Sequence, residues 1–412
     1  MVQRRPELNP VPKMLTIEDV ELEGKTVFVR VDINTPVHPE TGQLIEQTRL
    51  EEAAITIRDL AKSKVVVGSH QGRIGRPDYI GMEMHAAILA RILGKKVEYV
   101  EDVYGPAAKE AIEKLRNGQV MMLDNLRFTA EENQEFKPGD AGKTVFVQRL
   151  KGHFDACVLD AFPTAHRSSP SIVGFADILP TCAGRVVAKE LRSLERIFAI
   201  EKGPYVTVLG GAKVADRIEA IDALIANSRA DKVLLSGVVG LLFLKALGRY
   251  YGDLDVDGEQ KLLPRAKQLL NDYPETFELP IDVAIKVDGG RREVEASGLA
   301  ADYEVLDVGK RTVDHYTRLI KGAGTVFMSG PPGAFEYDGF SEGTEGLLRA
   351  MGSSLGTTIV SGGHLSAALH KLKIHESIDH VSTAGGALVQ YLAGKRLPLI
   401  DALERAAVRW EG

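Results

Sequence analysis

The chain has 412 residues, 44% of them hydrophobic and 26% charged, and a formal net charge of −6. This composition predicts a globular protein of two or more domains, with no general attraction for nucleic acid. The N-terminus lacks the apolar segment of a signal peptide, and the most apolar stretch, 238–247, is far shorter than the roughly 20 residues that a membrane span needs. The two cysteines, Cys157 and Cys182, predict buried thiols and a reducing cytoplasm.

The first half of the chain alternates short apolar runs with amphipathic stretches. This βαβα order predicts a parallel sheet with helices on both faces and right-handed crossovers. Strands are predicted at 27–31, 65–67, 97–100, 120–123 and 156–159, and helices at 48–61, 82–93, 106–115 and 143–150.

A longer amphipathic stretch covers residues 181–199 and ends at Gly203-Pro204. We interpret it as a helix that connects two domains, although its periodicity fits an ordinary core helix equally well. The predicted domains are 1–184 and 203–394, with 185–202 as the connecting helix.

The second half repeats the alternation, so we predict an α/β protein with two doubly wound, Rossmann-like parallel-sheet domains joined by a long hinge helix. Each domain is expected to bind a ligand beyond the carboxyl ends of its strands. The charged, glycine-rich segment 288–301 is expected to be an exposed loop, and 261–271 a helix. Strands are predicted at 206–209, 233–235, 283–285, 326–328, 358–360 and 381–383.

Polar and basic side chains follow the predicted strands of the first half. Because the carboxyl ends of parallel strands meet at one edge, these loops converge. Each cation alone fits a solvated loop or a local ion pair, but the set favours a small ligand with several negative charges, since arginine presents a planar donor fork to phosphate or carboxylate. The set comprises Asp32, Asn34, Arg49, His70, Gly72, Arg73, Gly75, Arg76, Asn125, Arg127, Asp160, Thr164, His166 and Arg167.

Residues 205–217 have the pattern of a strand, a glycine turn and a helix. Gly210 and Gly211 interrupt a β-branched run, and helical spacing begins at Lys213. The turn places backbone N–H groups at a helix N-terminus, where the dipole favours an anion. Lys213 and Arg217, one helical turn apart, add two cations. Taken alone, the stretch is either a tight βα turn or a phosphate-binding turn.

Four more glycine turns follow strands of the second half. Glycines are common at βα turns, but five such turns favour a nucleotide, and Glu336 could accept hydrogen bonds from ribose hydroxyls. The P-loop and the Gly-x-Gly-x-x-Gly fingerprint are both absent, which disfavours a nicotinamide-dependent oxidoreductase. The turns are Ser236-Gly237, Gly330-Pro-Pro-Gly333, Ser361-Gly-Gly363 and Ala384-Gly-Gly386.

A basic rim and a glycine-lined rim on separate domains favour phosphoryl transfer between two anionic substrates, with a hinge that closes and expels water. An ionised carboxylate acceptor needs no general base, and no convincing base is found. Neither His70 nor His166 has Cys or carboxylate neighbours at metal-ligand spacing, and neither has a serine at nucleophile-elbow spacing.

Seven motifs, in order from about residue 25 to the C-terminus, resemble those of the phosphoglycerate kinases, most nearly the archaeal branch. Each is weak alone, and together they are highly specific. They are Arg30-Val-Asp-Ile-Asn34, Ser69-His-Gln-Gly-Arg73, Leu123-Asp-Asn-Leu-Arg-Phe128, Asp160-Ala-Phe-Pro-Thr-Ala-His-Arg167, Leu209-Gly-Gly-Ala-Lys-Val-Ala-Asp216, Gly330-Pro-Pro-Gly-Ala-Phe-Glu336 and Val381-Ser-Thr-Ala-Gly-Gly-Ala387.

The resemblance implies reversible phosphoryl transfer between 1,3-bisphosphoglycerate with ADP and 3-phosphoglycerate with ATP, in a cytoplasmic enzyme that is a monomer or a dimer. It implies Mg²⁺ carried with the nucleotide, and a segment 395–412 that packs back onto the first domain. Arg49, Lys213, Gly363 and Gly386 would stabilise the transferred group. Phosphoglycerate would contact Asp32, Asn34, Arg49, His70, Gln71, Gly72, Arg73, Arg127 and Arg167. The nucleotide would contact Gly211, Lys213, Arg217, Gly237, Glu336, Ser361, Gly362, Gly363 and His364.

The chain departs from the family pattern near the nucleotide. The family usually has Gly-Gly-Gly-Asp-Thr where this chain has Ser361-Gly-Gly-His-Leu365, and that aspartate assists Mg²⁺. Mg²⁺ is therefore expected to rest on nucleotide oxygens and water. Arg217 replaces a lysine, Ser236-Gly-Val238 replaces a glycine triplet, and Ser329 replaces an asparagine. These departures keep open an alternative, a phosphometabolite-binding protein with altered catalysis.

Overall fold

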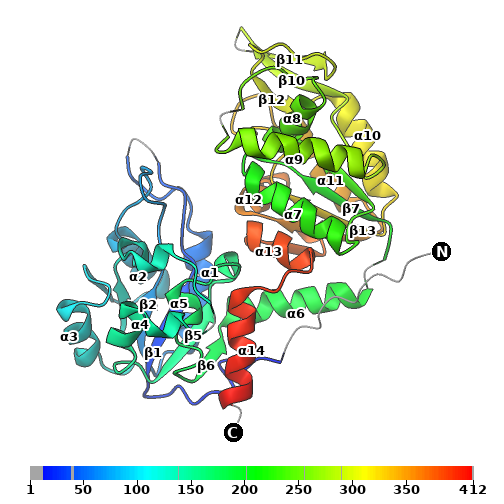
Figure 1. The fold of residues 1–412 in the computed structure, drawn as a ribbon. Helices are drawn as coiled ribbons and strands as arrows, with labels where there is room; N and C mark the ends of the chain where they lie inside the picture. Colours follow the sequence, from blue (N-terminus) through cyan, green and yellow to red (C-terminus); the bar gives the residue numbers. More distant parts are fainter. Residues whose placement is uncertain are drawn as a thin grey trace. The chain divides into compact units, whose positions relative to one another are not determined.

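The computed structural model describes residues 13–38, 41–137, 139–200, 202–254, 256–288 and 290–410. The described chain forms two compact units. The first contains residues 13–192 and 396–410, and the second contains residues 193–395. Helix α6 (Arg185–Ile200) begins in the first unit and ends in the second (Figure 1).

The first unit is built on a parallel six-stranded sheet in the order β3-β4-β2-β1-β5-β6. Strand β1 lies in the middle of the sheet, and all six of its residues are buried because helices cover both faces. The strands are β1 (Thr26–Val31), β2 (Lys64–Gly68), β3 (Val97–Val100), β4 (Val120–Leu123), β5 (Ala156–Asp160) and β6 (Thr181–Ala183). The helices are α1 (Thr48–Asp59), α2 (Glu83–Leu93), α3 (Pro106–Lys114), α4 (Val145–Leu150), α5 (Pro170–Val173) and α14 (Pro398–Trp410).

Helix α14 returns the end of the chain to the first unit. It packs against β6 and α5, and it contributes Ala407 and Trp410 to the apolar core there (Figure 1). The indole Nε1 of Trp410 donates to the carbonyl of Ala176 at 3.2 Å. Trp410 is the single tryptophan of the chain, so its fluorescence reports on the first unit.

The second unit is built on another parallel six-stranded sheet, in the order β15-β14-β13-β7-β8-β9. A separate antiparallel sheet has the order β11-β10-β12. The strands are β7 (Tyr205–Leu209), β8 (Lys232–Leu235), β9 (Phe277–Glu278), β10 (Asp282–Val287), β11 (Gly290–Glu295), β12 (Val305–Val308), β13 (Thr325–Ser329), β14 (Thr357–Ser361) and β15 (His380–Ser382). The helices are α7 (Val214–Ala226), α8 (Gly237–Ala246), α9 (Glu259–Asp272), α10 (Lys310–Lys321), α11 (Glu342–Gly352), α12 (Gly363–Leu372) and α13 (Gly385–Leu392).

The two sheets confirm the predicted fold class, with three local corrections. The helix expected over 181–199 begins only at Arg185, because Thr181–Ala183 pairs with the outer edge of β5 as strand β6. The strand expected at 283–285 exists, but it belongs to the antiparallel sheet. The segment 288–301, expected as a loop, contains the exposed edge strand β11, whose backbone pairs with β10.

The start of α6 is fixed by Asp160, at the end of β5. One carboxylate oxygen accepts hydrogen bonds from the backbone N–H groups of Val186 and Val187, at 2.8 and 3.1 Å. A Cβ at position 184 would lie 2.4 Å from the Asp160 carboxyl carbon, so only glycine fits there. Among the described residues, we find no helix with the length and apolar character needed to cross a membrane.

Candidate functional site

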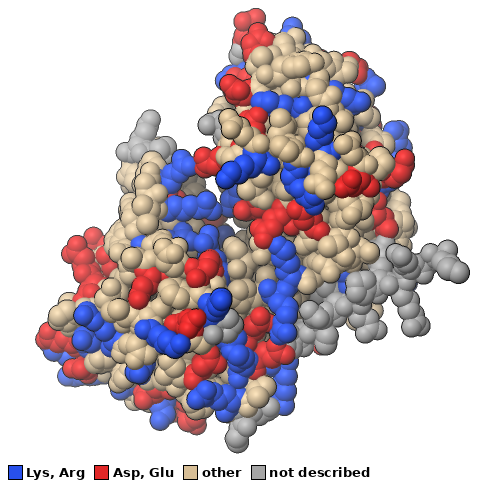
Figure 2. All heavy atoms as spheres, in the orientation of Figure 1, with Lys and Arg blue, Asp and Glu red and all other residues tan. Residues whose placement is uncertain are grey.

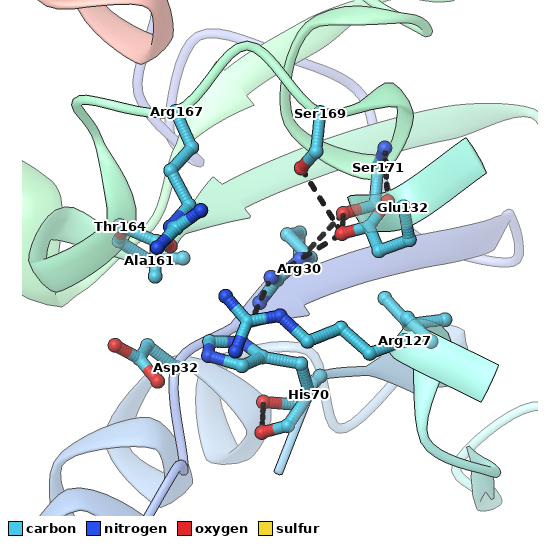
Figure 3. Close-up of polar contacts among 12 residues, drawn as sticks. Arg30, Asp32, His70, Arg127, Glu132, Ala161, Thr164, Arg167, Ser169 and Ser171 are labelled. Carbon is cyan, nitrogen blue, oxygen red and sulfur yellow. Dashed lines mark hydrogen bonds and ion pairs between the residues drawn. The ribbon is translucent and has the colours of Figure 1, made fainter. Parts of the chain in front are cut away.

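A cluster of five arginines and one histidine lies where the loops after β1, β2, β4 and β5 meet, and we call it the basic cluster. Several of its members are buried, and Figure 3 shows His70, Arg127 and Arg167 on the same side of the sheet end as Asp32. Figure 2 shows Lys and Arg side chains gathered on the surface of the first unit. The basic cluster comprises Arg30, Arg49, His70, Arg73, Arg127 and Arg167.

Arg30 occupies the centre of the basic cluster, although it was not among the candidate residues from the sequence. It lies inside β1 and is 1% exposed. Its Nε donates to Ser171 Oγ at 2.7 Å, and its Nη2 lies 3.3 Å from His70 Nδ1. Burial lowers the pKa of the Arg30 guanidinium, while Glu132 and Asp32 raise it. The sequence feature that could have identified Arg30 is its position as the one charged residue within the apolar run 27–31.

Glu132 is the second residue that sequence reasoning missed. It lies on the short 3₁₀ turn η2 (Glu131–Asn133), and its buried carboxylate is 3.6 Å from Arg30 Nη2. The hydroxyls of Ser169 and Ser171 donate to it at 3.0 and 2.5 Å. Glu132 thus balances Arg30 from the side away from Asp32 (Figure 3).

Asp32 and Arg49 form an ion pair at the mouth of the basic cluster. Arg49 Nη1 lies 2.9 Å from Asp32 Oδ2, and Asp32 is buried whereas Arg49 is partly exposed. Burial alone raises the pKa of a carboxyl, but the charges of Arg49 and Arg30 hold the pKa of Asp32 below its usual value. Burial also lowers the pKa of His70 well below its usual value, against the attraction of Asp32. His70 is therefore neutral near pH 7.

Arg127 and Arg167 extend from different segments toward the same space above Asp32 and His70 (Figure 3). Burial, reinforced by repulsion from Arg167 and Arg30, lowers the pKa of Arg127 to about 10. Arg127 Nη1 donates to the carbonyl of Gly72 at 2.6 Å. Arg167 is partly exposed and lies 3.8 Å from Glu135 Oε1. Arg73 is exposed on the loop after β2, and its charge also lowers the pKa of Arg127.

The remaining candidates in this unit are engaged in hydrogen bonds between loops. Asn34 Oδ1 accepts from the N–H of Gly72 at 3.0 Å. Gln71 is fully buried, and its side-chain amide bonds to Thr35, Asp78 and His85. Asn34, Gln71 and Gly72 thus join the loops that carry the basic cluster. Its buried cations suit an anion, because an ionic contact gains strength where water is excluded.

The glycine turns of the second unit also come together. The N–H of Gly211, after β7, donates to the carbonyl of Pro331, after β13, at 2.9 Å. Lys213 is exposed and is the N-cap residue of α7. Arg217, one turn later, is buried, and its Nε donates to the carbonyl of Gly210 at 3.2 Å. Burial lowers the pKa of Arg217 to about 10, so it keeps its charge at neutral pH. Gly237 opens helix α8 after β8.

Two further helices begin at the turns after β14 and β15. Gly362 is the N-cap residue of α12 and Gly363 its first residue, while Gly386 is the second residue of α13. The hydroxyl of Ser361 is buried and donates to the carbonyl of Gly385 at 3.2 Å, which joins the two turns.

The loop after β13 lies close to α12. The ring of Phe335 packs edge-on against the exposed His364 of α12, with ring centroids 5.8 Å apart. Glu336, the next residue, is exposed.

The residues near these turns do not form a Mg²⁺ site of their own. Mg²⁺ prefers oxygen ligands in octahedral geometry, whereas the first turn of α12 offers the imidazole of His364 and the apolar Leu365. Across the described ranges, no group of three or more His, Cys, Asp or Glu side chains could hold a metal ion.

Several known proteins that are similar to this chain carry the same description. The family model "Phosphoglycerate kinase" matches residues 17–395. A phosphoglycerate kinase of Methanobacterium bryantii is 40% identical over 401 residues, which cover 96% of this chain and 98% of that protein. One of Thermococcus kodakarensis is 39% identical, with 97% and 99% covered. The crystal structure of phosphoglycerate kinase from Pyrococcus horikoshii matches with a TM-score of 0.87 and 37% identity, over 96% of this chain and all of that one. The chain therefore belongs to the phosphoglycerate kinase family.

Proposed function

We propose that the two units divide the substrates of the phosphoglycerate kinase reaction between them. The reaction transfers a phosphoryl group reversibly between 1,3-bisphosphoglycerate with ADP and 3-phosphoglycerate with ATP, so the chain is a phosphotransferase with a carboxyl acceptor. The observation that carries the assignment is the basic cluster, in which arginines from separate loops converge on one space at the end of the parallel sheet.

The basic cluster is proposed to bind phosphoglycerate. Arg127 and Arg167 extend guanidinium groups toward this space, Arg73 is exposed on the loop after β2, and a guanidinium pairs well with phosphate or carboxylate. Arg30, which is paired with Glu132, lies 3.3 Å from His70 Nδ1 and supports that ring. Asp32 orients Arg49 through their 2.9 Å ion pair. Asn34, Gln71 and Gly72 support the same loops.

The glycine turns of the second unit are proposed to bind the nucleotide. Helices α7, α8, α12 and α13 each begin at such a turn, and the N–H groups at a helix N-terminus favour phosphate oxygens. The proposed contacts are Gly211, Lys213, Arg217, Gly237, Glu336, Ser361, Gly362, Gly363 and His364.

Arg49 and Lys213 are proposed to flank the transferred phosphoryl group, helped by the N–H groups of Gly363 and Gly386. Phosphoryl transfer depends on positioning and on fixed positive charge rather than on a covalent intermediate. An ionised carboxylate acceptor already has its nucleophilic oxygen, so no base is required. Mg²⁺ is proposed to enter with the nucleotide, held by phosphate oxygens and water.

Two further proposals concern the protein as a whole. The two cysteines, Cys157 and Cys182, are buried and free, which supports a reducing cytoplasmic compartment. The ligands are small molecules, and we propose that the enzyme acts as a monomer or a dimer without nucleic-acid or membrane partners.

The test is ADP formation from MgATP with and without 3-phosphoglycerate, together with a direct titration of 3-phosphoglycerate binding. The kinase predicts ADP formation that requires 3-phosphoglycerate. Tight binding without turnover would instead support the alternative, a catalytically altered phosphometabolite-binding protein, which the named relatives do not favour.

A further inference from the structure

A buried glutamine links three segments of the first unit through its side chain. Gln71 Oε1 accepts from the N–H of Thr35 at 3.0 Å, and Gln71 Nε2 donates to the carbonyls of Thr35 and Asp78, at 2.9 and 3.3 Å. The segment 32–35 carries Asp32 and Asn34, and the segment 71–78 carries Arg73. The side-chain amide of Gln71 therefore ties together the two loops that hold five of the residues predicted from the sequence to contact phosphoglycerate, itself included.

The backbone of Gln71 is tied to a third loop. Its N–H donates to Asn125 Oδ1 at 3.2 Å, and its carbonyl accepts from Asn125 Nδ2 at 2.7 Å. Asn125 Oδ1 also accepts from the N–H of Arg127 at 3.1 Å, and Arg127 Nη1 bonds to the carbonyl of Gly72. A displacement of Gln71 therefore moves the loops after β1, β2 and β4 together.

His85 on α2 completes the hydrogen bonding of the Gln71 amide. It is fully buried, and its Nε2 lies 3.0 Å from Gln71 Oε1. Because Gln71 Nε2 already donates to two carbonyls, the amide oxygen must face His85, so Nε2 of His85 carries the proton. His85 Nδ1 is then an acceptor, buried and without a hydrogen-bond partner among the described residues. A buried polar atom left unpaired is costly, which suggests that the ring is kept for the bond made by Nε2.

We infer that His85 and Gln71 are positioning residues for phosphoglycerate, and that Gln71 acts through the loops rather than by touching the substrate. The donors and acceptors of the Gln71 amide are all engaged by Thr35, Asp78 and His85, and its side chain is inaccessible to solvent. The inference rests on the proposed function, because it concerns the geometry of that same site. Helix α2, which carries none of the proposed phosphoglycerate contacts, would thus influence the affinity for the substrate through His85.

The first test compares three variants in 3-phosphoglycerate and ATP kinetics. His85→Leu removes the donor to Gln71, and Gln71→Glu replaces the donating nitrogen with an oxygen that cannot bond to either carbonyl. Each is expected to raise KM for 3-phosphoglycerate about tenfold or more while leaving KM for ATP unchanged, since His85→Leu loses one buried hydrogen bond and Gln71→Glu loses two, in one unit only. His85→Gln returns an N–H near the Nε2 position and is expected to restore most of the affinity.

The control for simple destabilisation is Leu89→Ala, one turn further along α2. Leu89 is fully buried in the apolar core and lies on the same face as His85. It is expected to weaken the unit, as followed by Trp410 fluorescence in denaturant, without changing KM for 3-phosphoglycerate. An equal rise in KM for Leu89→Ala and His85→Leu at matched stability would overturn the inference.

The second test examines the hydrogen bond between His85 Nε2 and Gln71 Oε1 directly, through the tautomer of the His85 ring. The ¹⁵N spectrum of the whole protein, with the His85 signals identified by their loss in His85→Gln, is expected to show the Nε2–H tautomer unchanged from pH 5 to 8. An Nδ1–H tautomer would remove His85 from the Gln71 amide. If the wild type forms no ADP in response to 3-phosphoglycerate, the proposed function fails. If it does and His85→Leu keeps the wild-type KM, only this inference fails.

Discussion

The hydroxyl of Thr56, on α1, donates a 2.5 Å hydrogen bond to Asp160 Oδ2. The same hydroxyl oxygen accepts from the N–H of Arg185 at 2.9 Å, and the other carboxylate oxygen caps α6. A single buried carboxylate therefore joins α1, which carries Arg49, to the helix that leads out of the first unit.

The first prediction concerns pH. Burial raises the pKa of Asp160 to about 6, against the hydrogen bonds that lower it. Between about pH 4 and 6 the folded unit binds a proton that the unfolded chain has released, so this group makes stability fall as pH rises through that window. The effect is on the order of 3 kcal/mol. Asp160→Asn keeps an oxygen for the two α6 N–H groups and is expected to remove this pH dependence. Denaturation at several pH values, followed by Trp410 fluorescence, measures it.

The matched control for that experiment is Asp155→Asn. Asp155 Oδ2 accepts a hydrogen bond from the N–H of Thr26, at the start of β1, at 2.7 Å. It is expected to leave the slope between pH 4 and 6 as in the wild type. A wild-type slope in Asp160→Asn would show that other groups produce the pH dependence.

The second prediction separates the arginines of the basic cluster from other surface arginines. Arg127→Ala is expected to weaken 3-phosphoglycerate binding by about 1.5–3 kcal/mol, the range for a charge-assisted hydrogen bond. Arg167→Ala and Arg73→Ala are expected to fall within the same range. Arg149→Ala, on α4, removes an exposed arginine that lies 5.5 Å from the ring centre of Tyr104, outside the basic cluster, and is expected to change nothing. Calorimetric titration with 3-phosphoglycerate measures these affinities. Unchanged affinity in all three cluster variants would show that these arginines do not bind the substrate.

Much of the fold and of the basic cluster can be predicted from the sequence, because the patterns that define helices, strands and turns are local. The β-branched run at 27–31 and the glycine after 93 define an element wherever they occur, and polar residues after parallel strands must gather at one edge. The ion pair between Arg30 and Glu132 joins residues about a hundred positions apart, and the sequence around neither residue predicts the other as its partner. Strand β10 is apolar in either sheet, so its pattern could not reveal antiparallel neighbours. The edge strand β11 is charged because it is largely exposed, and together with the glycines at its start that composition also describes a loop.

The third prediction concerns the loop that carries Glu336. The buried carboxylate of Asp307 accepts from Arg291 Nη1 and from the N–H of Gly343, both at 2.9 Å, and Arg291 Nη1 also donates to the carbonyl of Gly339. Arg291→Ala is expected to leave Asp307 as an unpaired buried charge, to loosen this loop and to raise KM for ATP several-fold, with KM for 3-phosphoglycerate unchanged.

Arg292→Ala supplies the control for Arg291→Ala, because Arg292 is the exposed neighbour on β11. It is expected to behave as the wild type in both KM values. A wild-type KM for ATP in Arg291→Ala would show that the loop keeps its shape without the bonds from Arg291 to Asp307 and Gly339.

The fourth prediction tests the division of labour between the units. Lys213→Ala is expected to lower kcat by about 10²–10³, as when one fixed charge is removed from a transition state. Its 3-phosphoglycerate dissociation constant is expected to stay unchanged, because the basic cluster belongs to the other unit. Lys371→Ala, an exposed lysine at the far end of α12, controls for charge and is expected to keep full activity. A large loss of 3-phosphoglycerate affinity in Lys213→Ala would contradict the assignment of one substrate to each unit.

The fifth prediction concerns Mg²⁺ and His364. A carboxylate at the first turn of α12 would offer the oxygen that a hard cation prefers, but without the cation it would repel the nucleotide phosphates. His364→Asp is therefore expected to weaken binding of ADP alone several-fold and to strengthen binding of MgADP, which calorimetric titration with and without Mg²⁺ resolves. His370→Asp, exposed in the last turn of the same helix, changes the charge equally and is expected to alter neither. Equal weakening of ADP and MgADP by His364→Asp would mean that position 364 faces the phosphates and not the cation. No change in either would place His364 outside the nucleotide site altogether.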